Sequence, residues 1–355
     1  MKKTHIIVAL IFSMILMLSG CQGKPQEQSL NAGSNDTRDE AVSGEIVIYT
    51  SLYDYMVEKM DKKLEEKFPG LKVEFLQGGS GKIQEKIAEE VDSGALGCDI
   101  MMVAEPSYSL ELKDIGILYP YDYPDKDKLM FEYDRDGYWY PVRVCNMVLA
   151  YDPEKYDISE LATSFKDFAE KSELKGQISM NNPLGSGTTY SSFVGLLDKY
   201  GEDYYKKLSK QGVLIASGSE ALEKLEAGEI KEIMVLEESV LKKRQEEGSK
   251  LEIIYPEDGS ILIPSTIMIV DEKVSKNKNI KAAQAVEEYL LSPEGQNLMV
   301  EGWMYSVRKD VRKYPYDAVA IGDIVDNVIP VDWDKCYQQR ASIREKIINN
   351  FDLPD

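Results

Sequence analysis

The stretch Glu45–Ala104, EIVIYTSLYDYMVEKMDKKLEEKFPGLKVEFLQGGSGKIQEKIAEEVDSGALGCDIMMVA, decides the fold. Three short apolar runs, EIVIYTS, KVEFLQG and CDIMMVA, alternate with two amphipathic helical patterns, and Pro69-Gly70 ends the first of these helices. A strand-helix-strand-helix-strand order predicts a parallel sheet with helices packed on its faces. Ligands of such α/β sheets lie beyond the carboxyl ends of the strands, where loops lead into helices.

Two long apolar stretches later in the chain interrupt this alternation. GYWYPVRVCNMVLAYDPEKY (137–156) contains Pro141, and SILIPSTIMIVDE (260–272) contains Pro264. Between them the alternation of strands and helices resumes, so we expect each stretch to run from one body into another. The sequence therefore predicts two Rossmann-like α/β lobes joined by a hinge, with a cleft between them. Lobe one is expected at 45–146 and 263–355, with lobe two, 147–262, inserted in it.

The N-terminus has the features of an export signal. Lys2 and Lys3 precede an apolar run from Ile6 to Leu18 that is too short to span a bilayer, and Ser19-Gly20-Cys21 follows. These residues resemble the lipobox of bacterial lipoproteins, which implies that 1–20 is a signal peptide and that Cys21 carries lipid. The alternative is an ordinary signal with a chance cysteine. Residues 21–44 are polar and predict a flexible tether, so we expect an extracytoplasmic body anchored by lipid to the cell membrane.

Composition excludes several classes of function. The chain has 42 Lys+Arg against 62 Asp+Glu, a formal charge of −20, which argues against nucleic acid or anionic lipid as a partner. An anionic ligand remains compatible, because a nest of N–H donors can dominate the field inside a cleft. The only histidine, His5, lies in the predicted signal peptide, which excludes a histidine-dependent nucleophile or metal site in the mature protein. No cofactor is expected.

The remaining cysteines, Cys98, Cys145 and Cys336, have no zinc-binding spacing. Cys98 and Cys145 stand among apolar residues and are expected in the core. Whether any two of the three pair is left open.

Three predicted strand-to-helix turns share glycine with serine or threonine: QGGSGKI (77–83), NNPLGSGTTYSS (181–192) and ASGSEAL (216–222). A helix start exposes unpaired N–H groups and the positive end of the helix dipole, and glycine leaves room for a ligand. Ordinary helix caps are the alternative reading of each turn. Their recurrence in both lobes favours a shared anion socket. The first turn is no nucleotide-hydrolysing P-loop, because Leu76 and Ile83 occupy positions that the motif reserves for glycine and a hydroxyl.

Several of these features together resemble a known family. The lipobox, the interrupted α/β lobes, GSGTT, GSEALEKLEAGE and SPEGQNLM followed by VRKDV are similar to extracellular solute-binding proteins of ABC importers. The resemblance is to the type 2 periplasmic-binding fold, in the ferric-iron branch that also includes binders of phosphonates and phosphorylated compounds. It implies a non-enzymatic monomer that delivers a small anionic solute to a permease with its ATPase.

The resemblance leaves two ligand classes open. Where ferric binders place a histidine and a glutamate, this chain has Tyr53 and Glu105, but the adjacent tyrosine pair expected near LEESVLKKR is replaced by Glu237, Glu238 and Ser239. A ferric or iron–anion site would then rest on Tyr53, Glu105 and Glu238. The preferred interpretation is a phosphonate or phosphorylated compound held by the helix starts.

Charged residues refine this expectation. Arg143, on the first crossing stretch, either adds a bidentate contact to the anion or pairs with a surface acid. Glu105 and Glu237 suggest a cationic group on the ligand, as in an aminoalkylphosphonate. The rival classes are a surface enzyme and a purely adhesive lipoprotein. The full predicted ligand-binding set is Tyr53, Gly79, Ser80, Gly81, Glu105, Arg143, Ser186, Gly187, Thr188, Thr189, Ser217, Ser219, Glu237 and Glu238.

Overall fold

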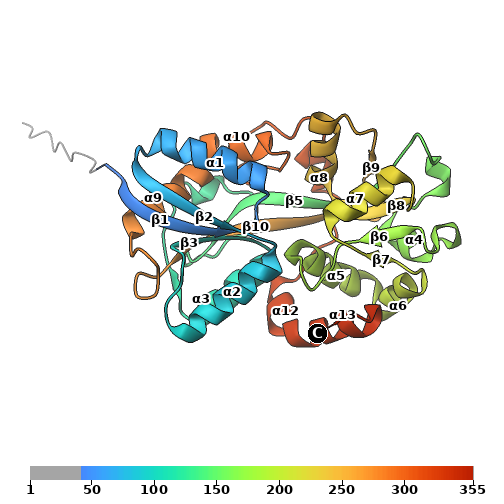
Figure 1. Ribbon diagram of the computed structural model, residues 1–355, viewed down its shortest axis with the longest axis horizontal. Coiled ribbons are helices and arrows are strands. Elements are labelled where there is room, and N and C mark those ends of the chain that lie inside the picture. The colour runs from blue at the N-terminus through green and yellow to red at the C-terminus, as the bar shows by residue number, and fades with distance from the viewer. Residues whose placement is uncertain (1–40, 355) are drawn as a thin grey trace, which may run out of the picture. The chain divides into compact units, whose positions relative to one another are not determined.

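The computed structural model describes residues 41–354 (Figure 1). The predicted signal peptide, Cys21 and all but the end of the predicted tether lie outside the described residues. Within the described part, no helix is both long enough and apolar enough to cross a membrane.

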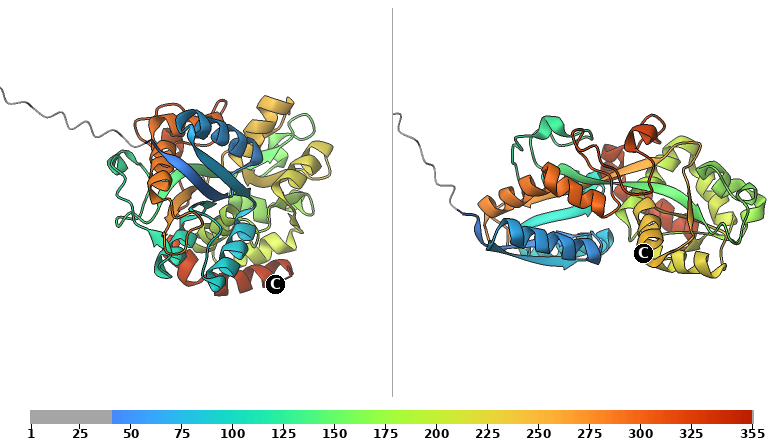
Figure 2. Two further views of the ribbon diagram at one scale, coloured as in Figure 1. Left: turned by 60° about the vertical axis from the view of Figure 1, so that its left-hand side comes forward. Right: turned by 90° about the horizontal axis from the view of Figure 1, so that it is seen from above.

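The N-terminal segment forms the predicted parallel arrangement. β1 pairs in parallel with both β2 and β3, and the helices that connect these strands lie on both sides of the sheet (Figure 2). The prediction of a strand-helix-strand-helix-strand unit is therefore confirmed. Its elements are β1 (Ser43–Thr50), α1 (Asp54–Lys67), β2 (Gly70–Gln77), α2 (Ser80–Ser93), β3 (Ile100–Ala104) and α3 (Pro106–Asp114).

Two long strands at the centre of the sheet extend from one lobe into the other. They are β5 (Tyr140–Tyr151) and β10 (Ile261–Val270), which correspond to the two apolar stretches of the sequence and pair antiparallel to each other (Figure 1). The strand order β2-β1-β3-β10-β5-β8-β6-β7 places them at the centre. The two crossing strands thus carry the chain into the inserted lobe and back again.

The inserted segment repeats the α/β pattern. β6 pairs in parallel with β7 and with β8, so three carboxyl strand ends again lie at one edge. The elements are α4 (Phe165–Glu170), β6 (Ile178–Met180), α5 (Gly187–Tyr200), α6 (Glu202–Lys210), β7 (Leu214–Ile215), α7 (Gly218–Ala227), β8 (Glu232–Leu236), α8 (Glu237–Lys242) and β9 (Glu252–Ile254). The remaining elements are β4 (Leu118–Tyr119), α9 (Ile280–Leu291), α10 (Pro293–Glu301), α11 (Ile321–Ile324), α12 (Trp333–Gln338) and α13 (Arg340–Phe351).

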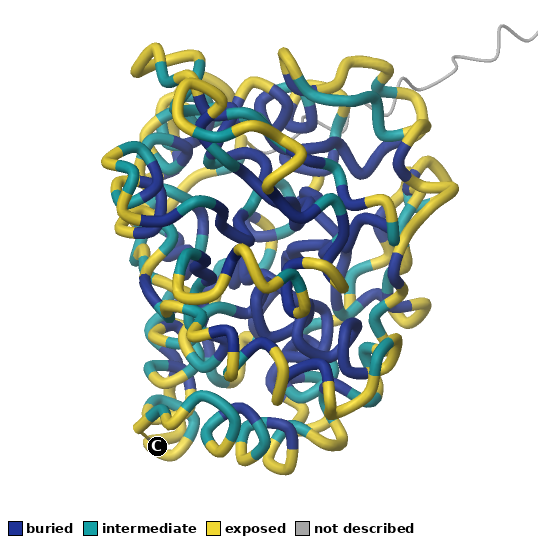
Figure 3. The backbone as a smooth tube through the Cα atoms, turned by 90° about the vertical axis from the view of Figure 1, so that its right-hand side faces the viewer, coloured by how far each residue is buried: buried dark blue, intermediate teal, exposed yellow. Residues whose placement is uncertain are grey.

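The crossing strands change hydrophobic core partway along. On β5, Val144 packs in the core beneath α1, whereas Met147 packs in the core beside α5. On β10, Ile263 belongs to the second of these cores and Ile267 to the first. Nearly every residue of both strands is buried, and Figure 3 shows that the buried segments of the chain lie in the interior of the molecule. The lobe boundaries at residues 146 and 262 stay predictions, and these core changes lie beside them.

The C-terminal helices depart from the predicted division. Cys336 of α12 and Ile343 and Ile347 of α13 share a core with Phe193 of α5 and Tyr205 of α6. The prediction counted 263–355 as lobe one throughout, and the packing of α12 and α13 differs from it. The apolar face of these helices had no assigned partner in the sequence pattern, and it packs on lobe two. Their polar residues Tyr337 and Arg340 bond to Asp114 and Glu105 of lobe one, so the two helices touch both lobes.

The three cysteines within residues 41–354 are buried and unpaired. Cys98, Cys145 and Cys336 each carry a free thiol in the part of the chain that the structure describes. Burial of Cys98 and Cys145 is confirmed.

Candidate functional site

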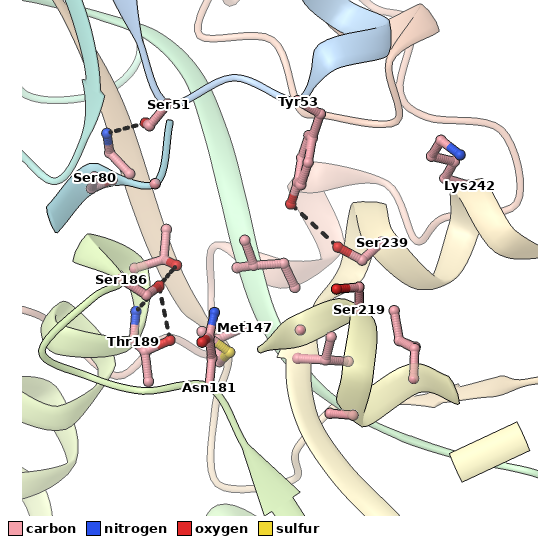
Figure 4. Close-up of a pocket in the computed structure, with 18 of the residues that line it drawn as sticks. Ser51, Tyr53, Ser80, Met147, Asn181, Ser186, Thr189, Ser219, Ser239 and Lys242 are labelled. Carbon is pink, nitrogen blue, oxygen red and sulfur yellow. Dashed lines mark hydrogen bonds between the residues drawn. The ribbon is translucent and has the colours of Figure 1, made fainter. Parts of the chain in front are cut away.

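A cavity of about 630 Å³ lies where strand ends of both lobes meet helix starts (Figure 4). Lobe one contributes residues that follow β1, β2 and β3, and lobe two contributes the starts of α5, α7 and α8. Eight residues of the predicted set line this cavity: Tyr53, Gly79, Ser80, Arg143, Ser186, Thr188, Thr189 and Ser219.

The starts of α2 and α5 contact each other across the two lobes. The Gly81 N–H of α2 donates to the Gly185 carbonyl oxygen at 3.3 Å, just before α5. Ser186 is the N-cap of α5, and its Oγ accepts the Thr189 N–H at 3.3 Å and lies 3.0 Å from Thr188 Oγ1. Helix starts have N–H groups without intrahelical acceptors. The two lobes therefore present hydroxyls and helix-start amides to one space, as an oxyanion requires.

The start of α7 forms a third side. Ser217 is the N-cap, and its Oγ accepts the Glu220 N–H at 3.2 Å. The cavity is lined by the next two residues, Gly218 and Ser219, rather than by Ser217. Of the two serines predicted for this turn, Ser219 lines the cavity and Ser217 does not.

Arg143 lies on β5 in the cavity wall, and its side chain is 3% exposed. Its Nη1 is 3.6 Å from Glu238 Oε1 and 2.9 Å from Met304 Sδ, and its guanidinium carbon lies 5.9 Å from the centre of the Tyr53 ring. The predicted alternative of a surface acid as partner is wrong, because Glu238 is as buried as the arginine. Burial raises the pKa of the Glu238 carboxyl, and the nearby arginine opposes that shift.

Tyr53 joins the lobes at the same end of the cavity. Its hydroxyl lies 3.2 Å from Ser239 Oγ and donates to Glu238 Oε1 at 3.4 Å (Figure 4). Burial raises the pKa of this phenol, so the neutral hydroxyl is the stable form. A polar bridge therefore closes the cavity on the side of α8.

Glu105 does not line the cavity. It is buried with a backbone φ of 86°, and its Oε1 accepts from Arg340 Nη2 at 2.9 Å and from Gln84 Nε2 at 3.3 Å. It lines instead a separate small void together with Gly81 and Gly187. The expectation that Glu105 receives a cationic ligand group is therefore wrong, because α13 supplies its cation from within the chain.

Glu237 also faces away from the cavity. Its Oε2 accepts from Asn146 Nδ2 at 2.9 Å, and its Oε1 accepts from the hydroxyls of Tyr305, at 3.0 Å, and Tyr255. Burial raises the pKa of this carboxyl to about 7, against the opposing effect of the three hydrogen bonds. Both acids assigned to an amine thus have partners inside the protein, and Glu238 is paired with Arg143.

The residues named for iron are not brought together. Tyr53 and Glu238 are neighbours, but Glu105 lies in the other void. The adjacent tyrosines of α6, Tyr204 and Tyr205, supply no iron ligand either, because both are buried with their hydroxyls donating to backbone carbonyl oxygens. Among residues 41–354, no group of three or more His, Cys, Asp or Glu side chains is placed to hold a metal ion.

Sequence reasoning missed several lining residues: Ser51, Asp54, Tyr55, Asn181, Gly218, Ser239, Lys242, Lys243 and Glu247. Lys242 Nζ lies 5.2 Å from the centre of the Tyr55 ring and pairs with Glu246 at 2.9 Å. Ser239 and Lys242 are three residues apart on α8, a spacing that puts side chains on one helix face. The spacing of Ser239 and Lys242 in LEESVLKKR is the feature of the sequence from which they could have been predicted to lie on the same side of the helix.

Comparison with known proteins places the chain among binding proteins. A family model for bacterial extracellular solute-binding proteins matches residues 98–335. An uncharacterised protein of Haemophilus influenzae is 23% identical over 274 residues, covering 72% of this chain and 75% of that protein.

Solved structures share the fold at low identity. The periplasmic binding protein AfuA from Actinobacillus pleuropneumoniae, with exogenous fructose-6-phosphate bound, superposes with a TM-score of 0.75 at 21% identity, covering 88% of this chain and 99% of that one. Iron-bound HitA from Pseudomonas aeruginosa gives 0.74 at 18% identity, with 85% and 99% covered. The periplasmic binding protein P5PA gives 0.73 at 19% identity, with 87% and 100% covered. These likenesses confirm the predicted type 2 periplasmic-binding fold.

Proposed function

The chain belongs to the family of bacterial extracellular solute-binding proteins, and from that premise we propose that it captures a phosphonate or phosphorylated solute. The ligand is held in the cavity between the lobes and delivered to an ABC permease with its ATPase. Binding shifts an equilibrium between open and closed lobes, and the solute is released unchanged. Recovery of a bound solute with its chemical structure intact supports this role, and turnover of that solute contradicts it.

The observation that carries the proposal is the meeting of the α2 and α5 helix starts at one cavity. Ser80, Ser186 and Thr188 bring hydroxyls and helix-start amides from both lobes. A phosphoryl group has three terminal oxygens and accepts several such donors at once in charge-assisted hydrogen bonds, whereas a neutral solute offers fewer and weaker acceptors at one point. Because the donors come from two lobes, the anion also favours closure.

The contacts of the two acids argue against an amine as a required part of the ligand. Glu105 and Glu237, the acids that suggested an amine, are occupied by Arg340 and by tyrosine and asparagine side chains. AfuA, which shares this fold, has fructose-6-phosphate bound in its solved structure, and that ligand belongs to the phosphorylated class proposed here. We therefore favour an organic phosphate or phosphonate without a required amine.

The experiment is calorimetric titration of the mature protein with a panel of phosphate monoesters and alkylphosphonates. Ser186→Ala and Thr188→Ala each remove a hydroxyl from the socket, and each is expected to weaken binding by at least about tenfold, from roughly 1.5–3 kcal/mol per hydrogen bond to a charged group. Ser292→Ala is the matched control, because Ser292 is also an N-cap, of α10, and does not line the cavity.

The control separates affinity from stability. Loss of an N-cap lowers the free energy of unfolding by about 1 kcal/mol at either serine. Only Ser186→Ala is expected to lower affinity as well. If Ser186→Ala and Thr188→Ala bind every phosphoryl ligand with the affinity of the unsubstituted protein, the proposed phosphate socket is contradicted.

A ferric ligand is the second candidate, favoured by the fold shared with iron-bound HitA and by the Tyr53–Glu238 contact. A phenolate bound to Fe³⁺ gives a visible charge-transfer band. We expect no such band on adding Fe³⁺ with or without phosphate, because Glu105 does not face Tyr53 in the cavity. A band that Tyr53→Phe abolishes would favour the iron receptor.

Membrane attachment is proposed through lipid on Cys21. In an export-competent bacterial host, the full chain is expected in the membrane fraction, and Cys21→Ala is expected in the soluble extracytoplasmic fraction. A control substitution at Cys98, such as Cys98→Ser, should leave the distribution of folded protein unchanged, since this cysteine is buried in lobe one. Membrane attachment that survives Cys21→Ala would contradict the lipid anchor.

A further inference from the structure

The guanidinium of Arg143 is a buried cation whose hydrogen bonds are incomplete. Its Nε is buried and has no hydrogen-bond partner among the described residues. Its Nη1 contacts the thioether of Met304 at 2.9 Å, which is a weak acceptor, and lies 3.6 Å from Glu238, beyond hydrogen-bond range. A group with five donors thus lines the cavity with no strong acceptor recorded at hydrogen-bond distance.

Such a group indicates a missing acceptor. A guanidinium stays charged at every physiological pH, and a buried donor without a partner destabilises the folded protein. A planar oxyanion in the cavity would satisfy adjacent N–H groups of the arginine together. The arginine therefore points to an anionic group of the ligand.

The charges around Arg143 fit this assignment. Besides the arginine, the charged residues that line the cavity are Lys242 and Lys243 of the α8 end, which are partly buried, and Asp54 and Glu247, which are exposed. Glu247 already pairs with Lys243 at 2.9 Å and lies 3.8 Å from Lys242. Exposed acids are screened by solvent. The nearest acid is buried Glu238, which offsets part of the arginine's charge at 3.6 Å but accepts no hydrogen bond from it, so the arginine still has N–H groups to offer a ligand.

This cationic end is separate from the phosphate socket. In Figure 4, Ser80, Ser186 and Thr189 lie on one side of the cavity, and Tyr53, Ser239 and Lys242 lie on the other, with Met147 between them. Arg143 belongs to the second side, because its guanidinium lies 5.9 Å from the Tyr53 ring. A single phosphoryl group held at the α2 and α5 starts leaves the arginine with the Glu238 ion pair at 3.6 Å and without an oxygen acceptor at hydrogen-bond distance.

We propose that the ligand carries a second anionic group, a carboxylate, which binds Arg143 with Lys242 beside it while the phosphoryl group occupies the α2–α5 socket. The substrate class is thus a phosphorylated carboxylic acid. The inference rests on the proposed phosphate socket and adds to it the opposite end of the ligand.

The test compares ligands that differ only at this end. Phosphoglycerate and glycerol phosphate form a three-carbon pair with and without a carboxylate, and phosphogluconate and sorbitol phosphate form a six-carbon pair. Calorimetry on the mature protein should show a preference of at least about tenfold for the acid in one pair or both, as expected for a charge-assisted bidentate contact. The ligand pair that shows this preference also indicates how far apart the phosphoryl group and the carboxylate bind.

Variants assign the preference to residues. In Arg143→Gln the preference should fall below about threefold while the affinity for the carboxylate-free ligand stays within about threefold of its original value. Lys242→Gln changes a half-buried residue of α8 that lines the cavity; it keeps the test open if Arg143→Gln does not fold, and should reduce the preference in part. Thermal melting verifies that each variant is folded.

Each outcome is decisive. Equal affinity for acid and neutral partner in both pairs overturns the second anionic group and leaves the phosphate socket standing. An Arg143→Gln variant that weakens both members of a pair equally also overturns it, because the arginine would then hold the phosphoryl group itself. If no phosphorylated probe binds, the proposed function and this inference fall together.

Discussion

Substitution of Gly187 tests whether the lobes bind the ligand in the closed arrangement. Gly187 is the first residue of α5, in lobe two, and a Cβ added there would lie 2.7 Å from the Ala104 carbonyl oxygen and 2.9 Å from Glu105 Cγ, both in lobe one. The nearer atom is backbone and cannot rotate away. Gly187→Ala therefore forces the two lobes apart at the socket.

The magnitude follows from this overlap. Relieving it requires a shift of several tenths of an ångström between packed backbones, and over-packing of this kind costs about 1–3 kcal/mol. Because the strain exists only when the lobes are in contact, it reduces the population of the closed state and not the fold of either lobe. We expect the dissociation constant for a phosphate monoester to rise by roughly 5- to 150-fold.

The assay is calorimetry together with small-angle X-ray scattering of the protein with and without ligand. Gly322→Ala is the control, since a Cβ on this helical glycine of α11 meets no atom within 4 Å. It should bind and close as the unsubstituted protein does. If Gly187→Ala binds with unchanged affinity and shows the same ligand-induced compaction, the reasoning from the α2–α5 contact is refuted.

Three further predictions concern the surrounding contacts. Arg340→Ala removes the cation that pairs with buried Glu105, so it should lower the melting temperature and speed ligand dissociation. Stopped-flow measurements give the dissociation rate, and an unchanged rate would show that this ion pair does not hold the lobes together. Tyr53→Phe removes the hydroxyl that meets Ser239 across the cavity and should weaken closure by about 1 kcal/mol, measured as ligand affinity, with equal affinity as the contrary result. Burial raises the pKa of the Glu232 carboxyl to about 8. Between the ordinary pKa of a glutamate and that value, the folded state binds a proton that the unfolded state does not, so the free energy of unfolding should rise as pH falls through this window. Glu232→Gln should flatten that pH dependence in denaturant titrations, and an unchanged pH dependence would contradict the raised pKa.

The architecture was predictable because its signals are local. The strand and helix periods of Glu45–Ala104 and the two apolar stretches around Pro141 and Pro264 each report on neighbouring residues. The position of the cavity at the helix starts was predictable for the same reason, since a helix start in a parallel α/β unit lies at the edge of the sheet where ligands bind. Ser80 and Ser186 needed only their place in the pattern.

The partners of the acids were not predictable. Glu105 and Arg340 are 235 residues apart in sequence, and Asn146 and Glu237 are 91 apart, so no periodicity relates them. From the sequence, the carboxylates of Glu105 and Glu237 therefore suggested a cationic group on the ligand, whereas in the fold each has a partner within the protein. The packing of α13 on lobe two was missed on the same ground, because a helix pattern gives the apolar face and not the surface that it meets.

The most direct test of the account is a crystal structure of the mature protein with a phosphate monoester bound. We expect the phosphorus atom between the starts of α2 and α5, with its oxygens accepting from the hydroxyls of Ser80 and Ser186 and from the Thr188 N–H. A phosphoryl group bound elsewhere in the protein, without contact to these three donors, would contradict the proposed socket.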